Sequence, residues 1–229
     1  MNTIAVLQSN YLPWKGYFDD INDVDVFIFY DDVQYTKRNW RNRNKIKTSA
    51  GPKWLTVPVG ASHRWLICEV AIKDDWWQKK HWKRIVQNYA KAPFFENYRA
   101  PLEHIYLGSR WRSLSQLNQT LIRLVACEFL GIEVEFRDSR EFSLAGEKKS
   151  RLLDLLRQVG ATRYVSGPVA KDYLLEADFA RAGIDLVWKD YRGYPEYPQF
   201  HPPFDHQVSI LDLLFQTGPR AADHIWGWR

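Results

Sequence analysis

The stretch IAVLQSNYLPWKGYFDDINDVDVFIFYDD, residues 4–32, contains two apolar runs separated by a short amphipathic segment. The runs Ile4–Leu7 and 24–30 predict buried strands, because both are short, continuous and rich in branched or aromatic residues. Between them, Phe18 and Ile21 have helical spacing. A strand, a short helix and a second strand within about thirty residues indicate a βαβ unit, which implies a parallel sheet.

The rest of the chain continues to alternate between strands and helices. Amphipathic patterns predict helices over residues 75–89, 114–130, 147–159 and 208–218. Apolar runs predict strands at IEVEF (132–136), TRYVSG (162–167) and IDLVWKDY (184–191). The segments KWLTVPV (53–59) and ICEVAI (67–72), on either side of GASHRW, predict a pair of strands or a hairpin. We therefore expect one α/β domain over residues 1–229, with a mostly parallel sheet and flanking helices in 1–190 and an irregular C-terminal cap in 191–229.

Composition is typical of a soluble globular protein. Of 229 residues, 26% are charged and 45% are apolar, and no apolar run approaches the length of a membrane span. The sequence begins without a recognisable signal peptide, so we expect a cytoplasmic protein. Cys68 and Cys127 have no metal-ligand spacing and are predicted to be small buried hydrophobic residues. The net charge of +5 favours an acidic partner or substrate.

A basic cluster, YTKRNWRNRNKIK, follows the second predicted strand directly. Ligands of parallel sheets collect beyond the carboxyl ends of the strands, which here are residues 8–14 and 31–35. The cluster is thus predicted to form a structured pocket for an anion or polar ligand, with a solvated loop and a nucleic-acid surface as alternatives. Asp31 and Asp32 are expected to neutralise some of its arginines.

Other positions have the side chains that chemistry requires. The turn NYLPWKGYF resembles the phosphate-binding turn of nucleotidylyltransferase-like, Rossmann-like proteins, although Trp14 and Tyr17 stand where those enzymes have a His-x-x-His signature. The alternative is a purely structural helix start. His81 beside aromatic residues is a candidate general base, or a helix-surface histidine without a function. Ser166, at the end of a strand, is a candidate nucleophile or a plain turn residue.

Four segments together resemble the WbqC-like protein family. They are residues 7–46, HWKRIVQNYAKAPFF (81–95), GATRYVSGPVAKDYL (160–174), and the C-terminal YPQF with VSILDLLFQTG. The resemblance covers essentially the whole chain. It implies a role in bacterial surface-polysaccharide (O-antigen) or natural-product biosynthesis.

The resemblance and the residue patterns together select the candidate site. The expected catalytic residues are His81, Asp32 and Ser166. The expected substrate-binding residues are Gln8, Tyr11, Trp14, Lys15, Tyr17, Asp31, Gln34, Tyr35, Arg38, Arg41, Asn42, Arg43, Asn44 and Gln199. We expect no metal.

The leading functional hypothesis is an acyl- or aminoacyltransferase that acts on a small amine, such as an amino sugar. The donor would be a phosphopantetheine thioester on an acyl or peptidyl carrier protein or on coenzyme A, with no tightly bound cofactor. Aminolysis of a thioester requires orientation and one general base. Two alternatives are a nucleotidyltransferase-like enzyme that uses ATP or a nucleotide sugar, and a non-enzymatic binding module. At most weak, non-specific nucleic-acid binding is expected.

Overall fold

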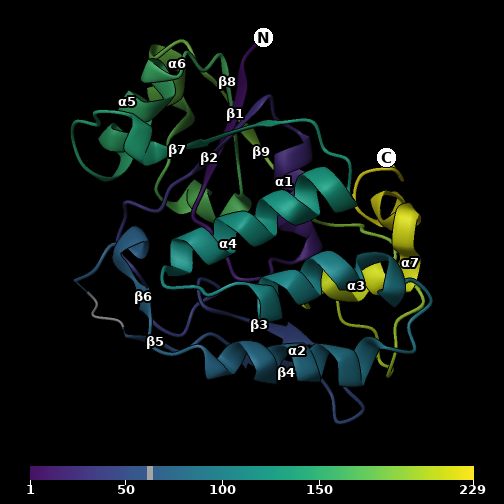
Figure 1. The fold of residues 1–229 in the computed structure, drawn as a ribbon. Helices are drawn as coiled ribbons and strands as arrows, with labels where there is room; N and C mark the ends of the chain where they lie inside the picture. The colour runs from purple at the N-terminus through teal and green to yellow at the C-terminus, as the bar shows by residue number, and fades with distance from the viewer. Residues whose placement is uncertain (61–63) are drawn as a thin grey trace.

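Five parallel strands form the central sheet of the protein (Figure 1). The computed structural model describes residues 1–60 and 64–229. Across the sheet, the strands are β7 (Glu135–Asp138), β2 (Val26–Phe29), β1 (Thr3–Leu7), β8 (Arg163–Ser166) and β9 (Asp185–Trp188). Every neighbouring pair in this sheet is parallel. The prediction of an α/β fold with a mostly parallel sheet is therefore confirmed.

The order of the strands places a topological switch at the middle of the sheet. Numbered by their appearance in the chain, the five strands run 3-2-1-4-5, the order of doubly wound sheets that bind nucleotides. The chain leaves β1 toward β2 on one side and leaves β8 toward β9 on the other. The carboxyl ends of β1 and β8 thus flank the crevice in which open α/β sheets bind ligands.

Helices cover both faces of the sheet (Figure 1). They are α1 (Lys15–Asn22), α2 (Trp76–Tyr89), α3 (Phe95–Glu103), α4 (Leu114–Arg123), α5 (Lys148–Gln158), α6 (Glu176–Arg181) and α7 (Ile210–Thr217). α5 and α6 contribute to the core on one face. The remaining helices contribute to the larger core on the other face.

Alternation along each strand divides the side chains between these two cores. Ile4 and Val6 of β1 pack with α5 and α6, whereas Ala5 between them packs on the opposite face. All four residues of β2 are buried. Burial on both faces explains why these strands are continuous apolar runs in the sequence rather than alternating ones.

The long connection between β2 and β7 contains two small antiparallel pairs. β3 (Arg43–Ile46) pairs with β4 (Lys53–Thr56), and β5 (Val59–Gly60) pairs with β6 (Ala71–Ile72). The prediction that 53–59 pairs with 67–72 is therefore wrong for most of its length, because β4 takes its partner from the basic cluster. The intervening residues 61–63 lie outside the described part of the chain.

Other features of the C-terminal half and of the surface complete the fold. Residues 191–209 lack regular structure, as predicted, but α7 is buried along its whole length and belongs to the core.

Cys68 is half-buried and Cys127 is exposed, so the prediction that both are buried is wrong. Among the described residues, no helix has the length and apolar character that crossing a membrane requires.

Candidate functional site

A cavity of about 1180 Å³ opens at the carboxyl ends of β1, β2 and β8. Gln8 follows β1, and Ser166 is the last residue of β8. Tyr30 and Asp32 follow β2 and also line the cavity. The cavity therefore occupies the topological switch point of the sheet, where the fold alone would place a ligand.

Arg41 gives the floor of the cavity a fixed positive charge. Its guanidinium donates to the side-chain oxygens of Gln8 and Asn10, and both of these residues line the cavity. Asn118 of α4 holds the Arg41 backbone by donating to its carbonyl at 2.8 Å. Burial lowers the pKa of Arg41, and within the described residues no carboxylate forms an ion pair with it. Arg41 is half-buried and bonds two amide side chains, and Asp31 acts on it only through its charge, so part of its positive charge is available to an anionic ligand.

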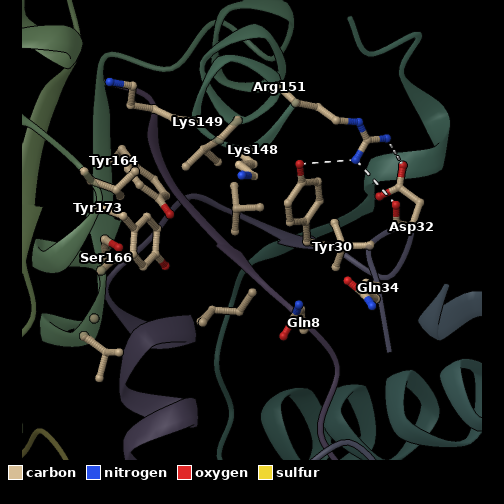
Figure 2. A pocket seen from close by; sticks show the side chains of 18 of the residues that line it. Gln8, Tyr30, Asp32, Gln34, Lys148, Lys149, Arg151, Tyr164, Ser166 and Tyr173 are labelled. Atoms are coloured by element: carbon tan, nitrogen blue, oxygen red, sulfur yellow. Dashed lines mark hydrogen bonds and ion pairs between the residues drawn. The ribbon is translucent and has the colours of Figure 1, made fainter. Parts of the chain in front are cut away.

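Asp32 belongs to a second polar group on the opposite wall. It accepts hydrogen bonds from Arg151 of α5 and from the Ser139 hydroxyl. Arg151 also donates to the Tyr30 hydroxyl at 3.2 Å (Figure 2). Asp32 was expected to neutralise the basic cluster near it in sequence, but its partner comes from α5 because that helix begins beside the end of β2. The ion pair ties the two elements together at the cavity wall.

The first turn of α5 supplies two lysines to the mouth of the cavity. Lys148 and Lys149 are the first two residues of the helix, and both line the cavity. Lys149 is paired with Asp178, whereas Lys148 is exposed and has no ion-pair partner among the described residues. The N-terminus of a helix favours negative charge, so two lysines there oppose the usual preference. Glu147 caps this helix start and Lys149 has its own partner, so Lys148 is the lysine whose charge a bound anion would offset.

The wall that faces Tyr30 is built from β8 and the turn after it. Figure 2 shows Tyr164, Ser166 and Tyr173 on one side of the cavity, across from Tyr30 and Asp32. Burial raises the pKa of the Tyr164 hydroxyl, and a hydrogen bond with Ser166 opposes this rise. Tyr164 is thus a neutral hydroxyl at physiological pH. This wall offers aromatic faces and hydroxyl groups, while the α5 side offers positive charge.

The structure brings together only part of the predicted site. Of the expected residues, those that line the cavity are Gln8, Asp32, Gln34, Arg41 and Ser166. Trp14 and Asn44 line a second, adjoining cavity. The two sets share one end of the sheet, and several of the other expected side chains instead bond within the fold.

His81 lies in the core and away from Asp32. Its Nδ1 atom is 2.9 Å from the Tyr11 hydroxyl, which in turn is 2.6 Å from the Tyr106 hydroxyl. Burial lowers the pKa of His81 to about 3, so its imidazole is neutral at physiological pH. Neither His81 nor Tyr11 is among the residues that line the cavity. The structure therefore does not bring the two candidate bases, His81 and Asp32, to the same cavity.

Asp31 anchors the ends of two strands to α4. Its carboxylate is fully buried and accepts from the Ser9 backbone N–H at 2.8 Å and from the Ser115 hydroxyl at 2.5 Å. Gln119 adds a longer contact at 3.4 Å. Asp31 therefore holds the loops after β1 and β2 in register beneath the cavity, whereas Asp32 faces the cavity itself.

The asparagines of the basic cluster also serve the backbone. The side chain of Asn42 donates to the Val57 carbonyl at 2.9 Å, and that of Asn44 donates to the Leu12 carbonyl at 2.6 Å. Both side chains are buried. Asn44 lies on the buried side of β3, and Asn42 comes directly before this strand.

Two other candidates, Lys15 and Gln199, take part in the packing of the C-terminal segment. The Lys15 ammonium donates to the Pro195 carbonyl at 3.1 Å and lies 4.9 Å from the centre of the Tyr194 ring. Burial lowers the pKa of Lys15 to about 8. Gln199 donates to Asp212 at 2.7 Å. Both side chains stabilise packing of the C-terminal segment on α1 and α7, and neither lines the main cavity.

The remaining candidates lie around the cavity without lining it. The Tyr17 hydroxyl donates to the Gln8 carbonyl at 3.1 Å, and Tyr35 is buried in the larger core. Arg43 donates to the Arg38 carbonyl and stacks over Trp54, 4.3 Å from the ring centre. Tyr17 thus positions a cavity residue, while Arg38 and Arg43 shape the outer side of the basic cluster.

Sequence reasoning missed several side chains of the cavity. They are Asn10, Tyr30, Lys148, Lys149, Arg151, Tyr164 and Tyr173. The lysines follow β7, so the rule about carboxyl ends of strands could have located them. The unusual pair of lysines at a helix start, in GEKKSR, was a second usable signal.

Comparisons with known proteins give the family of the chain but no reaction or ligand. A model of the WbqC-like protein family matches residues 8–224. The chain belongs to the WbqC-like family. An uncharacterised protein of Mycobacterium tuberculosis (strain ATCC 25618 / H37Rv), Rv1507c, is 46% identical to this WbqC-like chain over 227 residues, which cover 98% of each protein. No solved structure matches the chain.

Proposed function

We propose that the protein is a transferase that moves an acyl or aminoacyl group from a phosphopantetheine thioester to an amine. The observation that carries the proposal is the cationic mouth of the switch-point cavity, where Lys148 and Lys149 begin α5. Phosphate groups are strong ligands for helix N-termini and lysines together. Coenzyme A and carrier-linked phosphopantetheine both present phosphate at one end and a thioester at the other.

The two ends of the cavity differ in charge, and this difference suits an elongated donor. Figure 2 shows the two lysines at one end and Gln8 and Gln34 at the other. With its phosphate at the lysines, the donor would extend along the carboxyl ends of β1 and β8. The side-chain NH₂ group of Gln8 would contact the amide groups of the pantetheine arm, and the thioester would lie near Ser166.

Asp32 and Ser166 are the proposed catalytic groups. In the reaction, the amine nitrogen forms a bond to the thioester carbonyl carbon, the carbon–sulfur bond breaks, and the thiolate leaves. Asp32 would accept the proton that the amine loses, because it is the less exposed of the two carboxylates that line the cavity. Ser166 would donate a hydrogen bond to the oxygen that gains negative charge. A neutral His81 outside the cavity takes no part in this scheme.

The test is transfer and binding with matched lysine variants. Intact-mass measurement would follow an acyl group from acyl-coenzyme A, or from a loaded carrier protein, to a panel of amines. Lys148→Ala is expected to weaken coenzyme A binding about 10-fold or more, since one charge-assisted contact contributes about 1.5–3 kcal/mol. Lys79→Ala, an exposed lysine on α2, is the control and should leave binding unchanged. Absence of both binding and transfer with every donor would refute the proposal.

A nucleotide-dependent enzyme is the second candidate, and the 3-2-1-4-5 strand order favours it. ATP, CTP and nucleotide sugars also present phosphates that α5 could bind. Calorimetric titration with these ligands separates the two candidates. Binding of a nucleotide sugar or ATP that is tighter than binding of coenzyme A, and that Lys148→Ala abolishes, would select the second.

A further inference from the structure

A second cavity of about 490 Å³ adjoins the first. The two cavities share Asn10, Trp40 and Val169 in their linings. A ligand in one is therefore next to a ligand in the other at this junction. Trp14, Asn44, Tyr191 and Gln207 are among the residues that line only the second cavity.

The second cavity differs from the first in charge. Its lining in the described residues consists of aromatic, amide and apolar side chains and contains no lysine, arginine, aspartate or glutamate. The first cavity, by contrast, is lined by charged residues, among which the cations Arg41, Lys148, Lys149 and Arg151 outnumber the carboxylates Asp32 and Glu147. An anion would bind in the first cavity, and the second suits a ligand of another class.

The aromatic walls of the second cavity are fixed by their surroundings. A Cβ atom at position 16 would overlap the Trp14 indole, so Gly16 allows that ring to lie on the first turn of α1. The Trp14 and Tyr191 rings are 5.4 Å apart and meet at 69°. The Tyr191 hydroxyl is hydrogen-bonded to the Asp20 carboxyl group, 3.0 and 2.9 Å from its two oxygens. The rings thus form a rigid corner before any ligand binds.

Two amide groups remain for a ligand at this corner. Arg41 donates to the Asn10 side-chain oxygen, which leaves the Asn10 NH₂ group without a partner in the described part of the chain. The side chain of Gln207 is exposed and lines the same cavity. Asn44 is already engaged, because its side chain bonds the Leu12 carbonyl and the Lys45 N–H. Polar recognition would therefore come from Asn10 and Gln207.

We infer that the second cavity binds the acceptor as an amine-bearing sugar ring, with its amino group at the junction; this inference rests on the proposed function. The C–H face of a sugar ring packs on an aromatic face, its hydroxyls bond to amides, and an ammonium group is attracted to indole and phenol rings. A flat heterocycle stacks between parallel planes, whereas Trp14 and Tyr191 form a corner. The junction at Asn10 then presents the amine to the thioester in the first cavity.

Saturation-transfer NMR tests this directly and needs no turnover. The probes are methyl 2-amino-2-deoxy-β-D-glucopyranoside and, as the competing class, adenosine. Saturation is expected to reach the ring protons of the amino sugar, and Trp14→Leu should weaken that binding by about threefold to tenfold. Trp76→Leu is the matched control, because Trp76 lies on α2, is 57% exposed and lines neither cavity.

The outcomes separate this inference from the proposed function. Saturating coenzyme A should not displace the amino sugar if the cavities hold different ligands. Sugar binding that depends on Trp14, without coenzyme A binding, would support the inference and count against the donor proposal. The inference is overturned if the amino sugar shows no saturation transfer, if Trp14→Leu leaves the transfer unchanged, or if adenosine alone binds in a Trp14-dependent way.

Discussion

Asp20 is a carboxyl group that folding removes from water. It is 4% exposed, and burial raises its pKa to about 8. The hydrogen bond from Tyr191 and the positive charge of Lys189 oppose the rise, whereas the neighbouring Asp19 and Asp23 add to it. The same carboxyl group holds the Tyr191 ring that walls the second cavity. A protonated acid thus supports part of the candidate site.

Stability should fall as the pH rises toward 8 because of Asp20. The pKa is 3.8 in the unfolded chain and about 8 in the folded protein, so between these values the folded state holds a proton that the unfolded state has released. Stability from this group is fully present below the lower value and is lost as the pH rises through the higher one. Asp20→Asn stays neutral at every pH. Urea unfolding at pH 5, 6.5 and 8 should therefore show a growing advantage of the variant over the native protein.

A surface carboxylate provides the control for this pH dependence. Asp185 is largely exposed and pairs with Arg163 at 3.0 Å. Asp185→Asn should change stability by a nearly constant and small amount across the same range. A constant difference between Asp20→Asn and the native protein from pH 5 to 8 would contradict the assignment.

The start of α1 is the element on which the candidate site most depends. Its first turn has no capping hydrogen bond from a side chain of Trp14, and that indole instead folds back over Gly16. Pro13 precedes it and also lines the second cavity. The motif Pro-Trp-Lys-Gly is therefore explained by packing at the helix start and by the wall that this packing creates.

Gly16→Ala should destabilise the protein and disturb Trp14. The added methyl group overlaps the indole, and overpacking of this kind costs about 1–3 kcal/mol. Urea unfolding measures the loss, and near-UV circular dichroism reports the changed environment of the indole. In a Trp14→Leu background the same substitution should cost much less, since the clashing ring is gone. Equal costs in the two backgrounds would show that the overlap does not determine the effect.

The elements that the sequence predicted well are those with strong local patterns. Two apolar runs and one helical repeat predicted β1, α1 and β2. Ligands of parallel sheets bind beyond the carboxyl ends of the strands, and Gln8, Asp32 and Ser166 all lie at such ends. Each of these inferences depends only on residues close together in the chain. They therefore required no knowledge of the strand order.

Features that depend on distant partners could not be predicted in the same way. β3 is a polar segment whose alternation becomes visible only when β4 pairs with it. The pairing of Asp32 with Arg151 depends on where α5 begins relative to β2, and no local pattern specifies that position. His81 has the residue type and neighbours of a general base, but the packing of Tyr11 and Trp77 against it buries it in the core.

The whole molecule is held together by two cores, and β1, β2, β8 and β9 contribute side chains to both. Phe179 of α6 is fully buried in the smaller core, and Phe215 of α7 is fully buried in the larger one. Side chains of β1 reach both cores, so loss of either core should weaken the sheet that supports the other. This arrangement predicts that residues 1–229 unfold as one domain.

Truncating a buried phenylalanine in either core should therefore lower the stability of the whole domain, which should still unfold in a single transition. Phe179→Ala and Phe215→Ala are each expected to cost about 3–5 kcal/mol, the usual range for a buried phenylalanine. Far-UV circular dichroism, which reports helices, and tryptophan fluorescence should give coincident transitions in both variants. Two separated transitions in Phe179→Ala would instead indicate that the α5–α6 side unfolds independently.

The position of β1 at the centre of the sheet also has a consequence in time. Thr3 pairs with Arg163, so β1 is synthesised well before one of its two partners. At about 5–20 residues per second, a ribosome reaches that partner roughly 8–30 seconds afterwards. Throughout this interval one edge of β1 stays open to pairing with other chains. The nascent chain is therefore exposed to mispairing along β1 during synthesis, although both edges of this strand are paired in the folded protein.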